Sequence, residues 1–206
     1  MTTVLVTGFG RFPGAPFNPT AALAARLART ARRRGVNCIA HAFATSYAAV
    51  ERELPGLIAA HRPDAIMMLG LAGRRRHVSI EIFARNRMST WFPDAAGAVP
   101  LRTAITPGAL AHMRGRAAFS RLLATARATR VKTLLSRDAG NYLCNFAYWR
   151  ALEAAAQPGG PCRAVFVHVP RVRHKFHARA GTGGHDFTFD QLVRVGEAIL
   201  MAISRR

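Results

Sequence analysis

The chain has 206 residues, and half of them are hydrophobic, which suggests one domain, residues 1–206, with a substantial core. No apolar run approaches the roughly 18–20 residues of a membrane span, so a membrane protein is not expected. The opening residues, MTTVLVTGF, lack the features of a secretory signal, and three cysteines are an odd number. We therefore expect reduced thiols in a cytoplasmic protein.

The formal net charge is +20, and all but two of the 30 basic residues are arginines. A protein this basic has affinity for polyanions, which keeps nucleic-acid binding open as an alternative function. However, the arginines are spread along the chain, and the aromatic residues do not interleave with them as they do in a stacking platform. We expect a solvated basic surface and no specific nucleic-acid partner.

The first half of the chain alternates strand-like and helix-like patterns. Asn18 suits the N-cap of a helix and Pro19 its first position, while Gly35 is a natural stop. The next helix is expected to be disturbed at Pro55 and Gly56. In chain order the prediction is strand 2–9, a helix from Asn18 to Gly35, strand 36–45, helix 47–61, strand 64–71 and strand 78–86.

The second half opens with its longest irregular stretch, which is rich in proline and glycine and is expected to be functional or mobile. Thr188 and Gln191 have the spacing of a capping box at the start of the last helix. In chain order we predict the irregular residues 87–116, a helix near 117–128, strand 131–136, a helix carrying Cys144 in its first turn, strand 164–169, a basic loop 171–186 and the helix from Thr188.

Strands separated by helices predict a single-domain α/β fold. The expected architecture is a mostly parallel, twisted sheet with helices on both faces, a three-layer sandwich of the phosphorylase/hydrolase-like type. In such sheets, binding sites gather at the carboxyl ends of the strands. Four features fall near such ends in this chain: the loop 9–17, the turn 72–78, Cys144 and His168.

Cys144 is the first candidate for chemistry, within SRDAGNYLCNFAYWRAL at residues 136–152. A thiol in the first turn of a helix meets unpaired backbone N–H groups and the positive end of the helix dipole, which favours the reactive thiolate. The alternative is a small buried core residue, which is common for free cysteine.

Two further residues could complete a cysteine-peptidase centre, which needs an imidazole and an acceptor that orients it. His168 is the histidine that lies inside an apolar strand-like run, AVFVHV, and a satisfied core histidine is the alternative. Glu81 stands in the apolar context SIEIF, where a carboxylate is costly unless it is paired. The alternative for Glu81 is that strand alternation points it to solvent. No zinc motif, dinucleotide fingerprint or phosphate loop is present.

Four segments in the right order resemble the pyroglutamyl peptidase type I family, also called pyrrolidone-carboxylate peptidases. VLVTGFGRFPGAPFNPT is similar to the family's T-G-F-x-P-F-G…N-P-S start, and LGLAGRRRHVSIEIFARN to its G-L/Q-A-G-R…S-I-E-x-x-A-x-N segment. AGNYLCNFAYW resembles the family's A-G-x-x-V-C-N nucleophile motif, and AVFVHVP its G-F-I-H-V-P strand. The resemblance covers nearly the whole chain.

The resemblance implies a cysteine exopeptidase that removes N-terminal pyroglutamate (5-oxoproline) from peptides without a metal or cofactor. Cys144 would attack the pyroglutamyl carbonyl, His168 would act as general base and then acid, and Glu81 would orient His168. The residues expected to contact the substrate are Phe9, Phe12, Leu71 and Leu143. A homo-oligomer, either a dimer or a tetramer, is also implied.

The chain departs from the family pattern at a few positions. Arg11 replaces a proline, Pro13 replaces a glycine, and Trp91 replaces an arginine that belongs near the active site. Arg87 could substitute for that arginine. Two alternatives therefore stay open: a diverged relative with an altered or lost substrate, and a basic polyanion-binding protein.

Overall fold

The computed structural model describes residues 2–12, 14–173 and 187–205, so the predicted basic loop 171–186 lies outside the described residues from residue 174 on. Within the described residues, six strands form one sheet in the order β2-β1-β3-β8-β4-β7. All neighbouring pairs are parallel except β4 and β8, which run antiparallel. The strands are β1 (Thr3–Phe9), β2 (Asn37–Phe43), β3 (Ala65–Leu71), β4 (Val78–Glu81), β7 (Thr133–Ser136) and β8 (Arg163–Val169).

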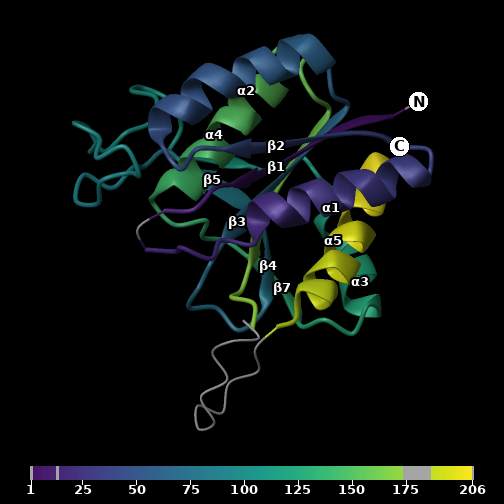
Figure 1. Ribbon diagram of the computed structural model, residues 1–206. Helices are drawn as coiled ribbons and strands as arrows, with labels where there is room; N and C mark the ends of the chain where they lie inside the picture. Colours follow the sequence, from purple (N-terminus) through teal and green to yellow (C-terminus); the bar gives the residue numbers. More distant parts are fainter. Residues whose placement is uncertain (1, 13, 174–186, 206) are drawn as a thin grey trace, which may run out of the picture.

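Five helices in the described part of the chain cover the two faces of this sheet (Figure 1). Two of them pack together on one face, and the other three cover the opposite face, each layer enclosing its own apolar core. The first layer is α2 (Tyr47–His61) and α4 (Leu143–Ala156), and the second is α1 (Thr20–Arg33), α3 (Phe119–Ala128) and α5 (Phe189–Ser204). The predicted fold class, a mostly parallel α/β sheet between two helical layers, is confirmed.

Local sequence signals account for several of the helix ends. Thr188 caps α5 in a complete capping box with Gln191, as predicted. Gly35 has a φ of 79° just beyond the end of α1, a left-handed conformation that glycine adopts without strain. The start of α1 is one residue later than predicted, because Pro19 is the N-cap and the Asn18 side chain instead accepts from the backbone N–H of Thr20 at 3.1 Å.

The expected disturbance of the helix 47–61 is absent. This helix, α2, runs continuously from Tyr47 to His61 and contains Pro55. Its start is fixed by Ser46, whose side chain accepts from the N–H of Ala49.

The prediction of one strand over residues 78–86 is wrong. The chain leaves the main sheet at Ile82, so that β4 ends at Glu81 and β5 (Phe83–Arg85) pairs antiparallel with β6 (His112–Arg114) in a separate two-stranded sheet. The turn is held by two backbone hydrogen bonds of Ile82, whose N–H donates to Ser136 and whose carbonyl accepts from Gly115. Consequently β6 interrupts the stretch 87–116, which was predicted to be wholly irregular.

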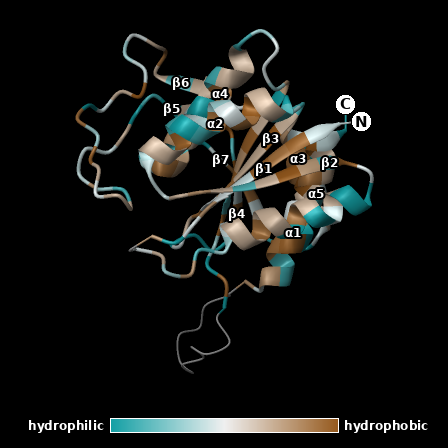
Figure 2. Ribbon diagram, turned by 45° about the horizontal axis from the view of Figure 1, so that its top comes forward, coloured by the Kyte–Doolittle hydropathy of each residue, from teal (hydrophilic) through white to brown (hydrophobic). Residues whose placement is uncertain are grey.

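The segment between β5 and β6 projects from the body of the molecule, whereas the strands of the main sheet are predominantly hydrophobic and enclosed (Figure 2). Its exposed apolar side chains are Trp91, Phe92, Val99, Leu101 and Leu110. No helix within the described residues is both long enough and apolar enough to cross a membrane.

Candidate active site

Cys144 lies at the start of α4, directly after the loop that follows β7. The N-cap residue Tyr142 makes no side-chain capping bond, and the first intrahelical bond runs from the N–H of Phe146 to the carbonyl of Tyr142 at 3.1 Å. The N–H groups of Leu143, Cys144 and Asn145 precede this bond and are therefore available to a ligand. The structure thus places the thiol in the first turn of a helix, as predicted.

Asn145, which the sequence analysis did not single out, fixes the position of this helix start. Its buried amide accepts from the N–H of Arg85 at 2.8 Å and donates to the carbonyls of Arg85 and Arg87 at 2.8 and 2.9 Å. All three bonds tie α4 to the chain that leaves β5. The available sequence signal was the polar Asn145 within the apolar run LCNFAYW, directly after the candidate nucleophile.

His168 is buried in β8 and faces Cys144 and Glu81. Its Nδ1 lies 2.8 Å from Oε1 of Glu81, and because a carboxylate can only accept, Nδ1 carries the hydrogen. The other partner of the ring is the Cys144 thiol. The structure therefore brings the three predicted catalytic side chains together in one site.

Burial by itself disfavours a charged His168 ring, but its neighbours outweigh this effect. The hydrogen bond and charge of Cys144, followed by those of Glu81, raise the pKa of His168 from 6.5 to about 9. At neutral pH the arrangement therefore favours the protonated ring of His168, which lies between the Cys144 sulfur and the Glu81 carboxylate.

Glu81 is fully buried, so the alternative that it points to solvent is wrong. In the antiparallel register of β4 and β8, Glu81 stands opposite Phe166, with His168 the diagonal neighbour on the same face of the sheet. Diagonal neighbours on adjacent strands are close enough for the Glu81 side chain to reach the imidazole ring of His168. Strand alternation therefore directs this carboxylate towards the helical layer that contains α4.

Arg75 completes the site and was not predicted. Its guanidinium lies 2.5 Å from the same Oε1 of Glu81 that His168 contacts, and it donates to the carbonyl of Asp138 at 2.7 Å. A buried carboxylate needs a compensating positive charge, and Arg75 supplies it from the turn after β3. Through Asp138, the same side chain joins Glu81 to the loop that leads to Cys144.

Gly70 provides the room in which these groups meet. It pairs with His168 across β3 and β8. A Cβ atom on Gly70 would stand 2.7 Å from carbons of the Phe166 ring and 2.8 Å from Sγ of Cys144. The thiol can approach the sheet here only because residue 70 has no side chain.

The four predicted substrate contacts come from β1, the loop after it, the end of β3 and the start of α4. Phe9 and Leu143 are buried in the apolar cluster against which Cys144 also packs. Leu71 follows Gly70 at the end of β3, and Phe12 is half-buried in the loop after β1. Trp91, in contrast, has an exposed fraction of 86%.

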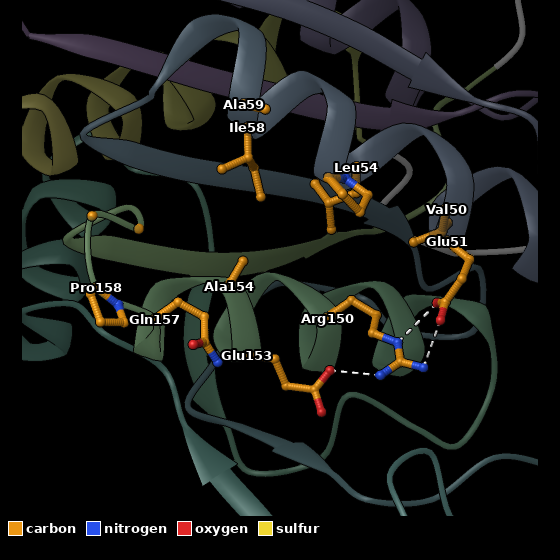
Figure 3. Close-up of a pocket in the computed structure, with 13 residues that line it drawn as sticks. Val50, Glu51, Leu54, Ile58, Ala59, Arg150, Glu153, Ala154, Gln157 and Pro158 are labelled. Carbon is orange, nitrogen blue, oxygen red and sulfur yellow. Dashed lines mark hydrogen bonds and ion pairs between the residues drawn. The ribbon is translucent and has the colours of Figure 1, made fainter.

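Two cavities lie on the α2–α4 side of the molecule, and neither is lined by a predicted site residue. The first, about 480 Å³, lies between α2 and α4, with the apolar Leu54 and Ile58 facing Ala154 (Figure 3). At its end Arg150 binds Glu51 through two bonds of 2.8 and 2.9 Å and Glu153 through one of 2.7 Å. The second, about 470 Å³, lies between these helices and residues 98–105. We interpret the Arg150 cluster as a tie between the helices.

No group of three or more histidine, cysteine or acidic side chains in the described part of the chain could hold a metal ion. The site consists of a thiol, an imidazole, a carboxylate and a guanidinium in one contiguous chain of contacts. This arrangement defines a thiol hydrolase of the cysteine-peptidase type on an α/β sheet.

Comparison with known proteins narrows this class. The family model for pyroglutamyl peptidase matches residues 2–206. A pyrrolidone-carboxylate peptidase of Gloeobacter violaceus is 34% identical over 81% of this chain and 80% of its own, and one of Thermococcus kodakarensis is 32% identical over the same shares. The structure of a mutant pyrrolidone carboxyl peptidase from the hyperthermophile Pyrococcus furiosus is 26% identical, covers 98% of each chain and has a TM-score of 0.87. The chain belongs to the pyroglutamyl peptidase family, which confirms the resemblance identified in the sequence.

Proposed function

We propose that this protein removes N-terminal pyroglutamate from peptides, with Cys144 as the nucleophile, His168 as general base and acid, and Glu81 as the group that orients His168. Family membership supports the activity. The observation that supports these roles most directly is the contact of the buried His168 ring with both the thiol and the carboxylate.

The reaction follows from this geometry. His168 takes the proton of the Cys144 thiol, the sulfur forms a bond to the pyroglutamyl carbonyl carbon, and the π electrons of that carbonyl move to its oxygen. The N–H groups at the start of α4 hold the resulting oxyanion. When the C–N bond breaks, His168 donates a proton to the leaving amine, and a water molecule, deprotonated by His168, then releases the acyl group from the sulfur.

The substrate group suits the residues around the thiol. Pyroglutamate is an uncharged, flat lactam, and we propose that Phe9, Phe12, Leu71 and Leu143 contact its ring. Phe9 and Leu143 already share the apolar cluster beside Cys144. A mostly apolar site with a few hydrogen-bonding groups binds such a ring without needing a charged partner.

A fluorogenic pyroglutamyl amide tests this function. The wild-type protein should release the fluorophore, and Cys144→Ser should abolish turnover because the hydroxyl is a far weaker nucleophile than the thiolate. Cys162→Ser is the matched control, since Cys162 is exposed and outside the site, and it should keep full activity. Unchanged turnover in Cys144→Ser would refute the proposed nucleophile, and an inactive wild type would refute the proposed substrate.

We also propose that the chain acts in the cytoplasm as a single-domain subunit of a homodimer or homotetramer. The apolar side chains of the projecting segment, including Trp91, Phe92 and Leu101, support an assembly because exposed apolar groups of this size often mark protein contacts. Light scattering on the purified protein measures its oligomeric state, and a monomer at micromolar concentration would contradict the proposed assembly.

A further inference from the structure

Tyr47, the first residue of α2, lies beside the helix start that carries Cys144. Its ring makes edge contacts with Tyr142 and Phe146, at centroid separations of 6.0 and 5.1 Å. These two residues flank Cys144 on either side along the chain. Although it comes from a different helix, Tyr47 therefore packs directly against the segment of the nucleophile.

The hydroxyl of Tyr47 is buried and has no hydrogen-bond partner. The other two tyrosines of the chain differ in this respect, since Tyr142 donates to the carbonyl of Pro93 at 2.9 Å and Tyr148 to the carbonyl of Glu81 at 3.0 Å. An unpaired buried hydroxyl destabilises the fold, so one that persists in a folded protein requires an explanation. A substrate oxygen that pairs with it would be such an explanation.

The hydroxyl is also in the right protonation state to donate. Burial, and then the negative charges that Tyr142, Asp94 and Cys144 carry when ionised, raise the pKa of Tyr47 well above its ordinary value. The phenol is therefore neutral at every pH at which the enzyme would work.

We propose that the Tyr47 hydroxyl donates a hydrogen bond to a carbonyl oxygen of the bound pyroglutamyl group. This inference rests on the proposed function and adds a catalytic residue to it. The scissile carbonyl must lie over the Cys144 sulfur, and Tyr47 packs against the residues on either side of Cys144, so the scissile oxygen is the first candidate and the lactam oxygen the second. Tyr47 keeps its proton throughout, because His168 carries out the proton transfers.

Tyr47→Phe removes only the hydroxyl, and Tyr142→Phe is the matched control because that hydroxyl already has a protein partner. In the fluorogenic amide assay, Tyr47→Phe should lower kcat by about 100-fold, the low end for loss of one oxyanion donor. If the lactam oxygen is the acceptor, KM should rise instead. Tyr142→Phe should stay close to the wild type in both constants. Because the lost hydroxyl is unpaired, the melting temperature of Tyr47→Phe should not fall.

Two probes separate the two oxygens without relying on turnover. Pyroglutamyl aldehyde adds the thiol across its C=O bond, so that sulfur binds carbon, oxygen takes the proton, and a tetrahedral adduct forms. 2-Pyrrolidone presents only the lactam ring. The affinity of each is measured as protection of Cys144 against iodoacetamide.

If Tyr47→Phe binds the aldehyde more weakly but 2-pyrrolidone as well as the wild type does, the hydroxyl contacts the scissile oxygen. If Tyr47→Phe binds both probes more weakly, the hydroxyl contacts the lactam oxygen. Wild-type affinity for both probes together with wild-type kinetics would overturn the inference, as would an equal loss in Tyr142→Phe. If the wild type binds both probes but does not cleave the amide, the proposed function fails while the binding data still decide the contact. If neither probe protects the wild type, the inference fails as well.

Discussion

Gly70 is the position at which one added methyl group would disturb the reacting groups most directly. In Gly70→Ala, the new carbon would stand 2.7 Å from the Phe166 ring and 2.8 Å from Sγ of Cys144. Ordinary contact distances are about 3.5–4.0 Å, so the sulfur or the strand must move by roughly 0.7–1.2 Å. A displacement of about 1 Å at a reacting atom costs about 100-fold in rate. Overpacking should also lower the free energy of unfolding by about 1–3 kcal/mol.

Three measurements check this prediction: kcat on a pyroglutamyl amide, the rate of alkylation of Cys144, and unfolding in urea. Gly56→Ala is the control, because Gly56 lies in α2 with no atom within 4 Å of its added Cβ. The control should keep full kcat and gain about 0.5–1 kcal/mol from helix propensity. Wild-type kcat and alkylation rate in Gly70→Ala would refute the close packing of the thiol on this glycine.

Three further predictions follow from the charges. His168 has a pKa raised to about 9, so the stability from its charge is complete below pH 6.5 and is lost as pH rises through about 9. Glu81→Gln should weaken the pH dependence of the free energy of unfolding, measured in urea. If the slope of that free energy against pH between pH 7 and 9 did not change, the pairing of His168 with Glu81 would be contradicted. Arg150→Met should lower the free energy of unfolding in urea by about 1–2 kcal/mol, because three hydrogen bonds between charged groups are lost. The control is Arg52→Met, which changes an exposed arginine and should lower it by less than about 0.5 kcal/mol. Equal losses in the two variants would refute the tie between α2 and α4. Trp91→Arg should leave kcat/KM nearly unchanged, since residue 91 is exposed, and a rise of orders of magnitude would favour a diverged enzyme.

The sequence was sufficient to predict the elements whose signals are local. The buried strands of a parallel sheet read as apolar runs, and the ends of α1 and α5 follow from Gly35 and from the Thr188–Gln191 capping box. Cys144 and His168 could be identified because each lies near the carboxyl end of a strand, where α/β sites form. The departure of the chain at Ile82 could not be predicted, because it depends on hydrogen bonds to Ser136 and Gly115, far away in the sequence.

Arg75 and Tyr47, two residues that were not predicted, lack a local sequence signal of this kind. Arg75 is the middle one of three consecutive arginines, and only the position of Glu81 in the folded sheet determines which of them turns inward. Tyr47 lies at the start of an amphipathic helix, where an aromatic residue is an ordinary core contact. Its unpaired hydroxyl becomes evident only when α2 packs against α4.

The charge of the site differs from the charge of the chain. Arg75 and the His168 ring, whose pKa is raised, are the two basic partners of the Glu81 carboxylate, and His168 also contacts the Cys144 sulfur. This pairing allows a fully buried carboxylate in a chain that has only ten acidic residues. Exposed arginines elsewhere are screened by salt over about 8–10 Å. The protonation of His168 is therefore set by its immediate partners, and the net charge of +20 acts on what the surface attracts.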